Sequence, residues 1–107
     1  MQATPARKPC QSLDEVRANI DRLDRLIVPL LAERETYVRE AARFKATAES
    51  VVVPARVEQV IARVTELARQ SGASPVAIER IYRNIIDAMT ELEVAEHHLL
   101  HKGDARP

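Results

Sequence analysis

The sequence is poor in cysteine, glycine and aromatic residues, and it has no excess of either charge. Its 107 residues include one cysteine, two glycines, two tyrosines and one phenylalanine, and 16 basic residues balance 16 acidic ones. The lone Cys10 cannot form an internal disulfide, which suits a reducing compartment. A balanced charge gives no overall attraction to nucleic acid or to an anionic membrane, so any partner must be recognised by a local site.

Long apolar runs are absent as well. No run approaches the roughly 20 apolar residues that span a bilayer, and the opening segment lacks the apolar region of a secretory signal. We therefore expect a cytoplasmic protein that binds neither nucleic acid nor membrane. The length predicts a single domain over residues 12–100, with a disordered or loosely ordered N-terminal tail over 1–11 and a C-terminal tail over 101–107.

Abundant alanine, leucine, arginine and glutamate favour an all-α fold. In "SLDE", Ser12 can cap a helix while Glu15 reaches back, as in a capping box. The first helix is therefore predicted to begin near Leu13 and to continue to about Ala46. Its apolar positions recur with helical periodicity and form one stripe, made of Val16, Ile20, Leu23, Ile27, Leu30, Leu31, Val38 and Ala41.

Two further helices follow. Pro54 fits the first turn of the second helix and Gly72 its end, while Ser74 and Pro75 can cap and begin the third, which should run to about Leu100. The inner face of the second helix is predicted to comprise Val57, Val60, Ile61, Val64, Leu67 and Ala68. The inner face of the third is predicted to comprise Ile78, Ile81, Tyr82, Ile85, Met89, Leu92 and Leu99.

The predicted first helix is too long for one small domain to cover. A helix of this length spans about 50 Å, whereas a compact domain of about 100 residues has a radius of gyration of about 13 Å. Its apolar stripe must therefore meet another chain. We predict an interlocked two-fold homodimer of three-helix protomers.

Two basic residues of the first helix point the same way as its apolar stripe. Arg34 and Lys45 are 11 residues apart and therefore lie within about 20° of each other round a helix. An unpaired buried cation is costly, so both need an anionic partner. One interpretation pairs them with Glu93, Glu96 or a carboxylate of the partner chain. The other is a pocket between helices that binds a small dicarboxylate.

The sequence carries no nucleophile with a neighbouring base, no phosphate-binding loop and no dinucleotide fingerprint. Any chemistry should then depend on positioning and electrostatic stabilisation. Three histidines gather near the end of the third helix, His97, His98 and His101. We expect them to be solvated and predict no metal site there.

Three segments together resemble the all-α chorismate mutase family, including its isochorismate pyruvate lyase branch. The first is "VRANIDRLDRLIVPLLAER", in which Arg17 precedes Arg34 by 17 residues. The second is "FK", which places Lys45, and the third is the "II" at Ile85 and Ile86 that precedes Glu93. The resemblance covers nearly the whole predicted domain, and the spacing of the three basic residues on the first helix is its most specific part.

The resemblance implies an interlocked homodimer with two equivalent sites. Members of this family rearrange chorismate to prephenate, or eliminate pyruvate from isochorismate to leave salicylate, and neither pericyclic reaction needs a cofactor. By position, Arg34 and Lys45 would bind the carboxylates and the ether oxygen of the substrate. Arg17 would reach a carboxylate from the other protomer, although helical geometry alone leaves it a solvated surface residue.

Two positions depart from the usual mutase pattern. Where Glu93 stands, the family more often has a glutamine that donates a hydrogen bond to the ether oxygen. A carboxyl group donates only when protonated, so we expect activity to be favoured at acidic pH. Typical mutases follow the second-helix arginine with a glutamate that contacts the ring hydroxyl, but Val57 follows Arg56 here, as an apolar residue does in the lyase branch.

Arg56 is a further candidate residue for the carboxylate site. The sequence is therefore consistent with three functions. The sequence favours a chorismate mutase with Lys45 and Glu93 as its catalytic residues. Isochorismate pyruvate lyase is the first alternative. The second is a non-enzymatic helical dimerisation module, in which the internal charges only set the register of the helices.

Overall fold

The computed structural model describes residues 9–102 and shows the predicted all-α architecture. In this range the chain forms three α-helices, α1 (Leu13–Ala41), α2 (Pro54–Ser71) and α3 (Pro75–Leu100), and two 3-10 turns, η1 (Ala42–Phe44) and η2 (Glu49–Val51). Most of the two predicted tails, residues 1–8 and 103–107, lies outside the described residues. Among the described helices, none is both long and apolar enough to cross a membrane.

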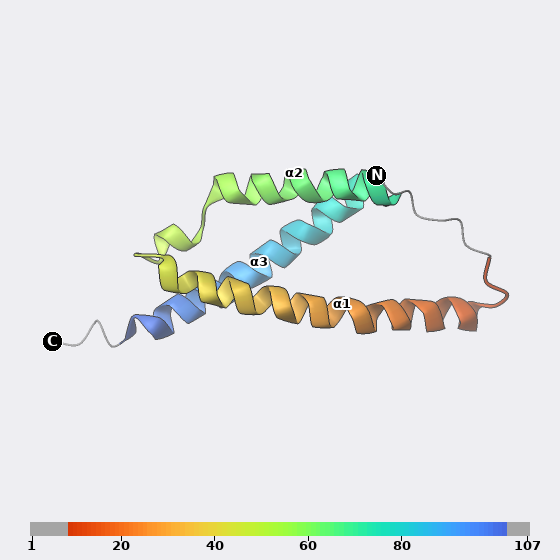
Figure 1. The fold of residues 1–107 in the computed structure, drawn as a ribbon, viewed down its shortest axis with the longest axis horizontal. Helices are drawn as coiled ribbons and strands as arrows, with labels where there is room; N and C mark the ends of the chain where they lie inside the picture. The colour runs from red at the N-terminus through yellow and green to blue at the C-terminus, as the bar shows by residue number, and fades with distance from the viewer. Residues whose placement is uncertain (1–8, 103–107) are drawn as a thin grey trace.

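The third helix holds the other two together. α3 packs against both α1 and α2, which run in opposite directions, and it crosses the second half of α1 (Figure 1). The first half of α1 extends beyond this contact, so the molecule is elongated, with extents of 67 × 27 × 19 Å. Its radius of gyration, 18.2 Å, exceeds the roughly 13 Å of a compact domain of similar length.

The helix ends follow the predicted capping signals. The Glu15 amide donates to Ser12 Oγ at 3.1 Å, and the Ala77 amide donates to Ser74 Oγ at 3.1 Å. The Glu15 carboxylate accepts from the Gln11 amide at 2.7 Å, one residue before the position that a capping box requires. Gly72 ends α2 with a φ of 78°, a left-handed conformation that glycine adopts without a steric penalty.

The predicted end of the first helix is wrong. Regular α-helix stops at Ala41, and η1 tightens the chain before Lys45, which is extended at φ −103° and ψ 126°. Periodicity could not locate this end because a 3-10 turn at a helix terminus needs no breaker residue. Lys45 therefore does not share a helix with Arg34.

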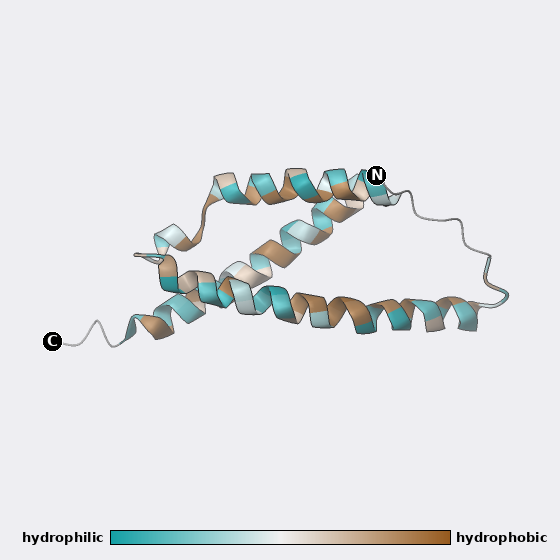
Figure 2. Ribbon diagram, viewed as in Figure 1, coloured by the Kyte–Doolittle hydropathy of each residue, from teal (hydrophilic) through white to brown (hydrophobic). Residues whose placement is uncertain are grey.

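The core of the single chain is small. It is formed by Ala42, Val51, Val60, Ile61, Val64, Ala68 and Met89. α2 contributes four of these residues, whereas no residue of α1 is buried. Leu67, Ile81 and Leu99, which were predicted to face inward, are more than half exposed in the chain by itself. Figure 2 shows apolar bands recurring along the half of α1 that α2 and α3 leave uncovered.

One ion-pair cluster ties α2 to α3. Arg83 donates two hydrogen bonds of 3.1 Å to the carboxylate of Glu58, and its Nε donates to Glu79 at 3.0 Å. The hydrogen bonds from Arg83 lower the pKa of Glu58 below its ordinary value of 4.5. The cluster stabilises the fold only while Glu58 is ionised.

This cluster predicts a pH-dependent stability. A group whose pKa is lower in the folded chain stabilises it above the unfolded pKa and loses this effect as pH falls through the folded pKa. Glu58→Gln should therefore lower Tm slightly at pH 7 and leave it unchanged near pH 3. Glu66→Gln is the matched control, since Glu66 pairs with Arg69 within α2. An equal loss of Tm at both pH values would contradict the assignment.

Candidate active site

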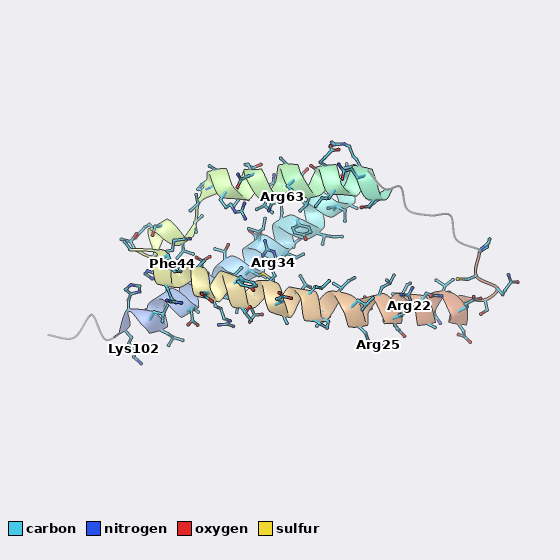
Figure 3. All side chains as sticks on the ribbon, in the orientation of Figure 1. Arg22, Arg25, Arg34, Phe44, Arg63 and Lys102 are labelled. Carbon is cyan, nitrogen blue, oxygen red and sulfur yellow. The ribbon has the colours of Figure 1, made fainter. Side chains whose placement is uncertain are left out.

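A cavity of about 380 Å³ lies between the three helices and the connector before α2. Four of its lining residues are basic, Arg34, Lys45, Arg56 and Arg63, and one, Glu93, is acidic. Most of the remaining lining is apolar, and five of these residues are valines of η2, of the connector after it and of α2. Figure 3 shows Arg34 and Arg63 in the region between α1 and α2. With four cations against one carboxylate, the cavity suits a small anion.

Lys45 and Glu93, which both line the cavity, form an ion pair. Lys45 Nζ lies 3.0 Å from Glu93 Oε2, and Glu93 is only 8% exposed. Glu93 reaches this position from the buried face of α3, while the extended backbone after η1 turns Lys45 toward it. The internal ion pair that the sequence suggested therefore forms at Lys45.

Arg34 has a different environment. Its NH1 lies 2.8 Å from Met89 Sδ, and its guanidinium carbon lies 6.0 Å from the centroid of the Tyr82 ring. Among residues 9–102, no carboxylate lies within ion-pair distance of Arg34. A thioether is a weak acceptor and a guanidinium has five donors, so most of the hydrogen-bonding capacity of Arg34 is not used within the described chain. Such a group favours bidentate binding of a carboxylate.

The second expected anion, Glu96, pairs with a residue that the sequence placed outside the inward stripe. Arg39 NH1 lies 3.5 Å from Glu96 Oε1, and Arg39 NH2 lies 2.8 Å from Glu35 Oε2. The hydrogen bond to Glu35 raises the pKa of Arg39. Glu96 is therefore not a partner of Arg34 or Lys45, because the crossing of α1 and α3 brings it beside Arg39 instead.

The second helix supplies two arginines to the cavity. Arg56 is an exposed residue of its lining and donates to Gln59 Oε1 at 2.6 Å. Val57, which stands where a glutamate is usual in mutases, also lines the cavity. Sequence reasoning missed Arg63, although its position two helical turns after Arg56 places both on one face of α2.

The structure does not bring Arg17 to this cavity within one chain. Arg17 is exposed on the first half of α1 and lies outside the cavity lining. Seventeen residues of helix separate it from Arg34 by about 26 Å along the axis.

The prediction that all three histidines are solvated is wrong for His97. This residue is 6% exposed, and its Nε2 lies 3.0 Å from the backbone oxygen of Lys45. The crossing of α3 beneath η1 covers it, which the isolated helix pattern could not reveal. Across residues 9–102, no group of three or more metal-ligating side chains is placed to hold a metal ion.

Comparisons with known proteins identify the family of the chain. Residues 16–94 match the sequence model of the family described as chorismate mutase type II. The chain is also 34% identical over 77 residues to an isochorismate pyruvate lyase from Pseudomonas aeruginosa, an alignment that covers 72% of this chain and 76% of that protein. The family match spans 79 of the 107 residues and includes Arg34 and Lys45. The chain belongs to the type II chorismate mutase family.

Proposed function

We propose that this protein is a chorismate mutase that rearranges chorismate to prephenate in the cationic cavity. The observation that carries the proposal is the environment of Arg34, which lines the cavity and has no carboxylate partner among the described residues. Chorismate carries two carboxylates, so it would supply the missing anions. Membership of the family supports the same substrate class.

The chain's own side chains have separate roles in this reaction. Arg34, together with Arg56, would bind the carboxylates and hold the enolpyruvyl arm folded over the ring, which selects a conformer that is rare in solution. The ether C–O bond then breaks as a C–C bond forms between the arm and the ring. All the electrons move within the substrate, so no nucleophile is required. Lys45 would stabilise the negative charge that develops on the ether oxygen.

A second candidate function is isochorismate pyruvate lyase. Two observations favour it: Val57 lines the cavity where mutases usually have a glutamate, and the curated relative from Pseudomonas aeruginosa is named as that lyase. The same cations could hold isochorismate while the ether C–O bond breaks and a ring hydrogen moves to the methylene carbon of the enolpyruvyl arm, so that pyruvate leaves and the ring becomes that of salicylate. The two functions differ in their products.

We also propose a homodimer that completes the site. Five of the eight predicted stripe residues of α1 are exposed in the single chain; Ile20, for example, is 52% exposed and Ile27 is 49% exposed. An apolar face of this length calls for a partner surface. A second copy, paired through a two-fold axis, would bring its Arg17 toward the cavity of the first.

The proposed function is tested by product analysis. Purified protein is incubated with chorismate and, separately, with isochorismate, and prephenate, pyruvate and salicylate are measured. We expect prephenate to form from chorismate at rates that rise with enzyme concentration. Salicylate and pyruvate as the dominant products from isochorismate would establish the lyase instead. No product from either substrate would contradict both proposals.

The proposed role of Glu93 predicts that kcat is higher at acidic pH. As a donor to the ether oxygen, its carboxyl group must be protonated, whereas a glutamine amide donates at every pH. Glu93→Gln should therefore flatten the profile of kcat between pH 5 and 8, and Glu96→Gln, which alters the pair with Arg39, should leave its shape unchanged. A wild-type profile that is already flat down to about pH 5, or one that Glu93→Gln leaves unaltered, would rule out this role.

A further inference from the structure

Two side chains of α3 contact Lys45, one at its ammonium group and the other at its backbone oxygen. Glu93 and His97 are one helical turn apart on α3, and they are the two buried polar residues among the described positions. Glu93 Oε2 lies 3.0 Å from the ammonium of Lys45, and His97 Nε2 lies 3.0 Å from its backbone oxygen. One face of α3 thus fixes both the head group of the lysine and the backbone that carries it.

The bond from His97 has a defined direction. A carbonyl oxygen can only accept, so Nε2 of His97 carries the proton and donates. The ring is held in place by His101, which stacks on it with centroids 4.0 Å apart and an interplanar angle of 27°. His101 in turn bonds through Nδ1 to the His97 backbone oxygen at 2.9 Å. This arrangement leaves the His97 ring little freedom to turn away from Lys45.

The Lys45 backbone needs such a partner because the chain leaves its helix there. The Lys45 amide still donates to the Ala42 oxygen at 3.3 Å, and the backbone oxygen of Lys45 is bonded by His97 at 3.0 Å. A backbone carbonyl that is shielded from water without a donor is costly. His97 supplies this donor. The bond also fixes the backbone at Lys45, where the segment that leads from η1 to η2 begins.

We propose that His97 is a positioning residue for Lys45. This inference rests on the proposed function, in which Lys45 acts on the ether oxygen. His97 touches no reacting atom; it fixes the backbone from which the ammonium extends. Because a misplacement of about 1 Å can cost about 100-fold in rate, loss of this bond should lower kcat much more than it changes KM.

The test compares three variants of the 107-residue protein. His97→Phe keeps a ring for the stack on His101 but removes the donor, and it should lower kcat by about 10- to 100-fold. His97→Gln places an amide donor near the position of Nε2 and should recover most of the loss. His98→Phe, the matched control at the exposed neighbouring histidine, should leave kcat unchanged. Unchanged kcat in His97→Phe, or no recovery in His97→Gln, would overturn the proposal.

A double-mutant cycle separates positioning from a general structural effect. If His97 acts through Lys45, adding His97→Phe to Lys45→Met should change kcat no further, whereas independent roles would give multiplying losses. Melting temperatures of all variants show whether each remains folded at the assay temperature. Multiplying losses in folded variants would overturn the proposal.

A measurement that uses no substrate tests the role of His97 independently of the proposed function. Reductive methylation with formaldehyde and cyanoborohydride modifies lysine amines, and peptide mass spectrometry gives the rate at each one. His97→Phe should raise the rate at Lys45 severalfold and leave Lys102 unchanged, and His97→Gln should restore the slow rate. An unchanged Lys45 rate in His97→Phe would refute the positioning role even if the enzyme turns over chorismate. Wild-type protein inactive on both substrates would instead refute the proposed function.

Discussion

Lys45→Met is expected to lower kcat by about 100- to 1,000-fold, the cost of removing one preorganised charge from a developing oxyanion. Lys45 is the cation nearest the reacting centre in the proposed mechanism, and its ammonium is already fixed by Glu93 at 3.0 Å. Because the interaction strengthens as the ether bond breaks, the loss should fall on kcat more than on KM. Steady-state kinetics with chorismate measures both parameters.

The control for this variant concerns Glu93. Lys45→Met alone leaves a carboxylate that is 8% exposed without its ion-pair partner, which by itself destabilises a fold. The double variant Lys45→Met with Glu93→Gln removes this unpaired charge and should regain the lost Tm without regaining kcat. Because Glu93→Gln has its own effect on kcat, the double variant is compared with Glu93→Gln alone. Equal kcat in these two variants would show that Lys45 only neutralises Glu93, and would contradict its catalytic role.

The paired substitutions Ile20→Glu and Ile27→Glu are expected to convert the protein to monomers and to abolish turnover. Both residues are about half exposed in the single chain, so an isolated monomer should tolerate glutamate at these positions. In the proposed dimer they lie in the apolar interface, where unpaired carboxylates are costly. Sedimentation velocity gives the oligomeric state, and the chorismate assay gives the activity.

The matched control is Arg25→Glu. Arg25 lies about 170° round α1 from the stripe and projects from the edge of α1 away from α2 (Figure 3). It should leave both the dimer and the activity intact. A wild-type protein that sediments as a monomer while turning over chorismate would contradict the shared site.

Complementation tests the role of Arg17 directly. Arg17→Ala and Arg34→Ala should each be inactive as homodimers. When equal amounts are mixed, unfolded and refolded together, half of the dimers are mixed, and each of these contains one site with both arginines intact. Activity should return to about a quarter of the wild-type value. No recovery from a mixture that forms dimers would assign Arg17 to the surface.

Apart from the end of α1, the helix ends could be predicted from local sequence because they depend on a few neighbouring residues. Ser12 and Ser74 cap the helices that they were expected to cap, and Gly72 adopts the left-handed conformation that ends α2. Periodicity also placed Arg34 on the inward face of α1. These features depend on interactions within about one helical turn, which the sequence contains in full.

The errors arose where separate elements meet. The 3-10 turn η1 replaces the last turns of the predicted first helix, so Lys45 reaches the cavity from an extended backbone. Glu96 pairs with Arg39, and His97 is buried beneath Lys45, because α3 crosses α1 at this point. The position of a crossing depends on packing between helices, and no single helix pattern specifies it.

The measurement that tests the central claim most directly is the melting temperature with and without chorismate, for wild type, Arg34→Met and Arg39→Met. Arg34 has no carboxylate partner within residues 9–102, so Arg34→Met should keep the ligand-free Tm but lose the rise that chorismate causes. Arg39→Met leaves Glu35 and Glu96 without their partner, so it should lower the ligand-free Tm and keep the rise. A full chorismate-induced rise in Arg34→Met would contradict the claim that the substrate supplies the counter-ion of Arg34.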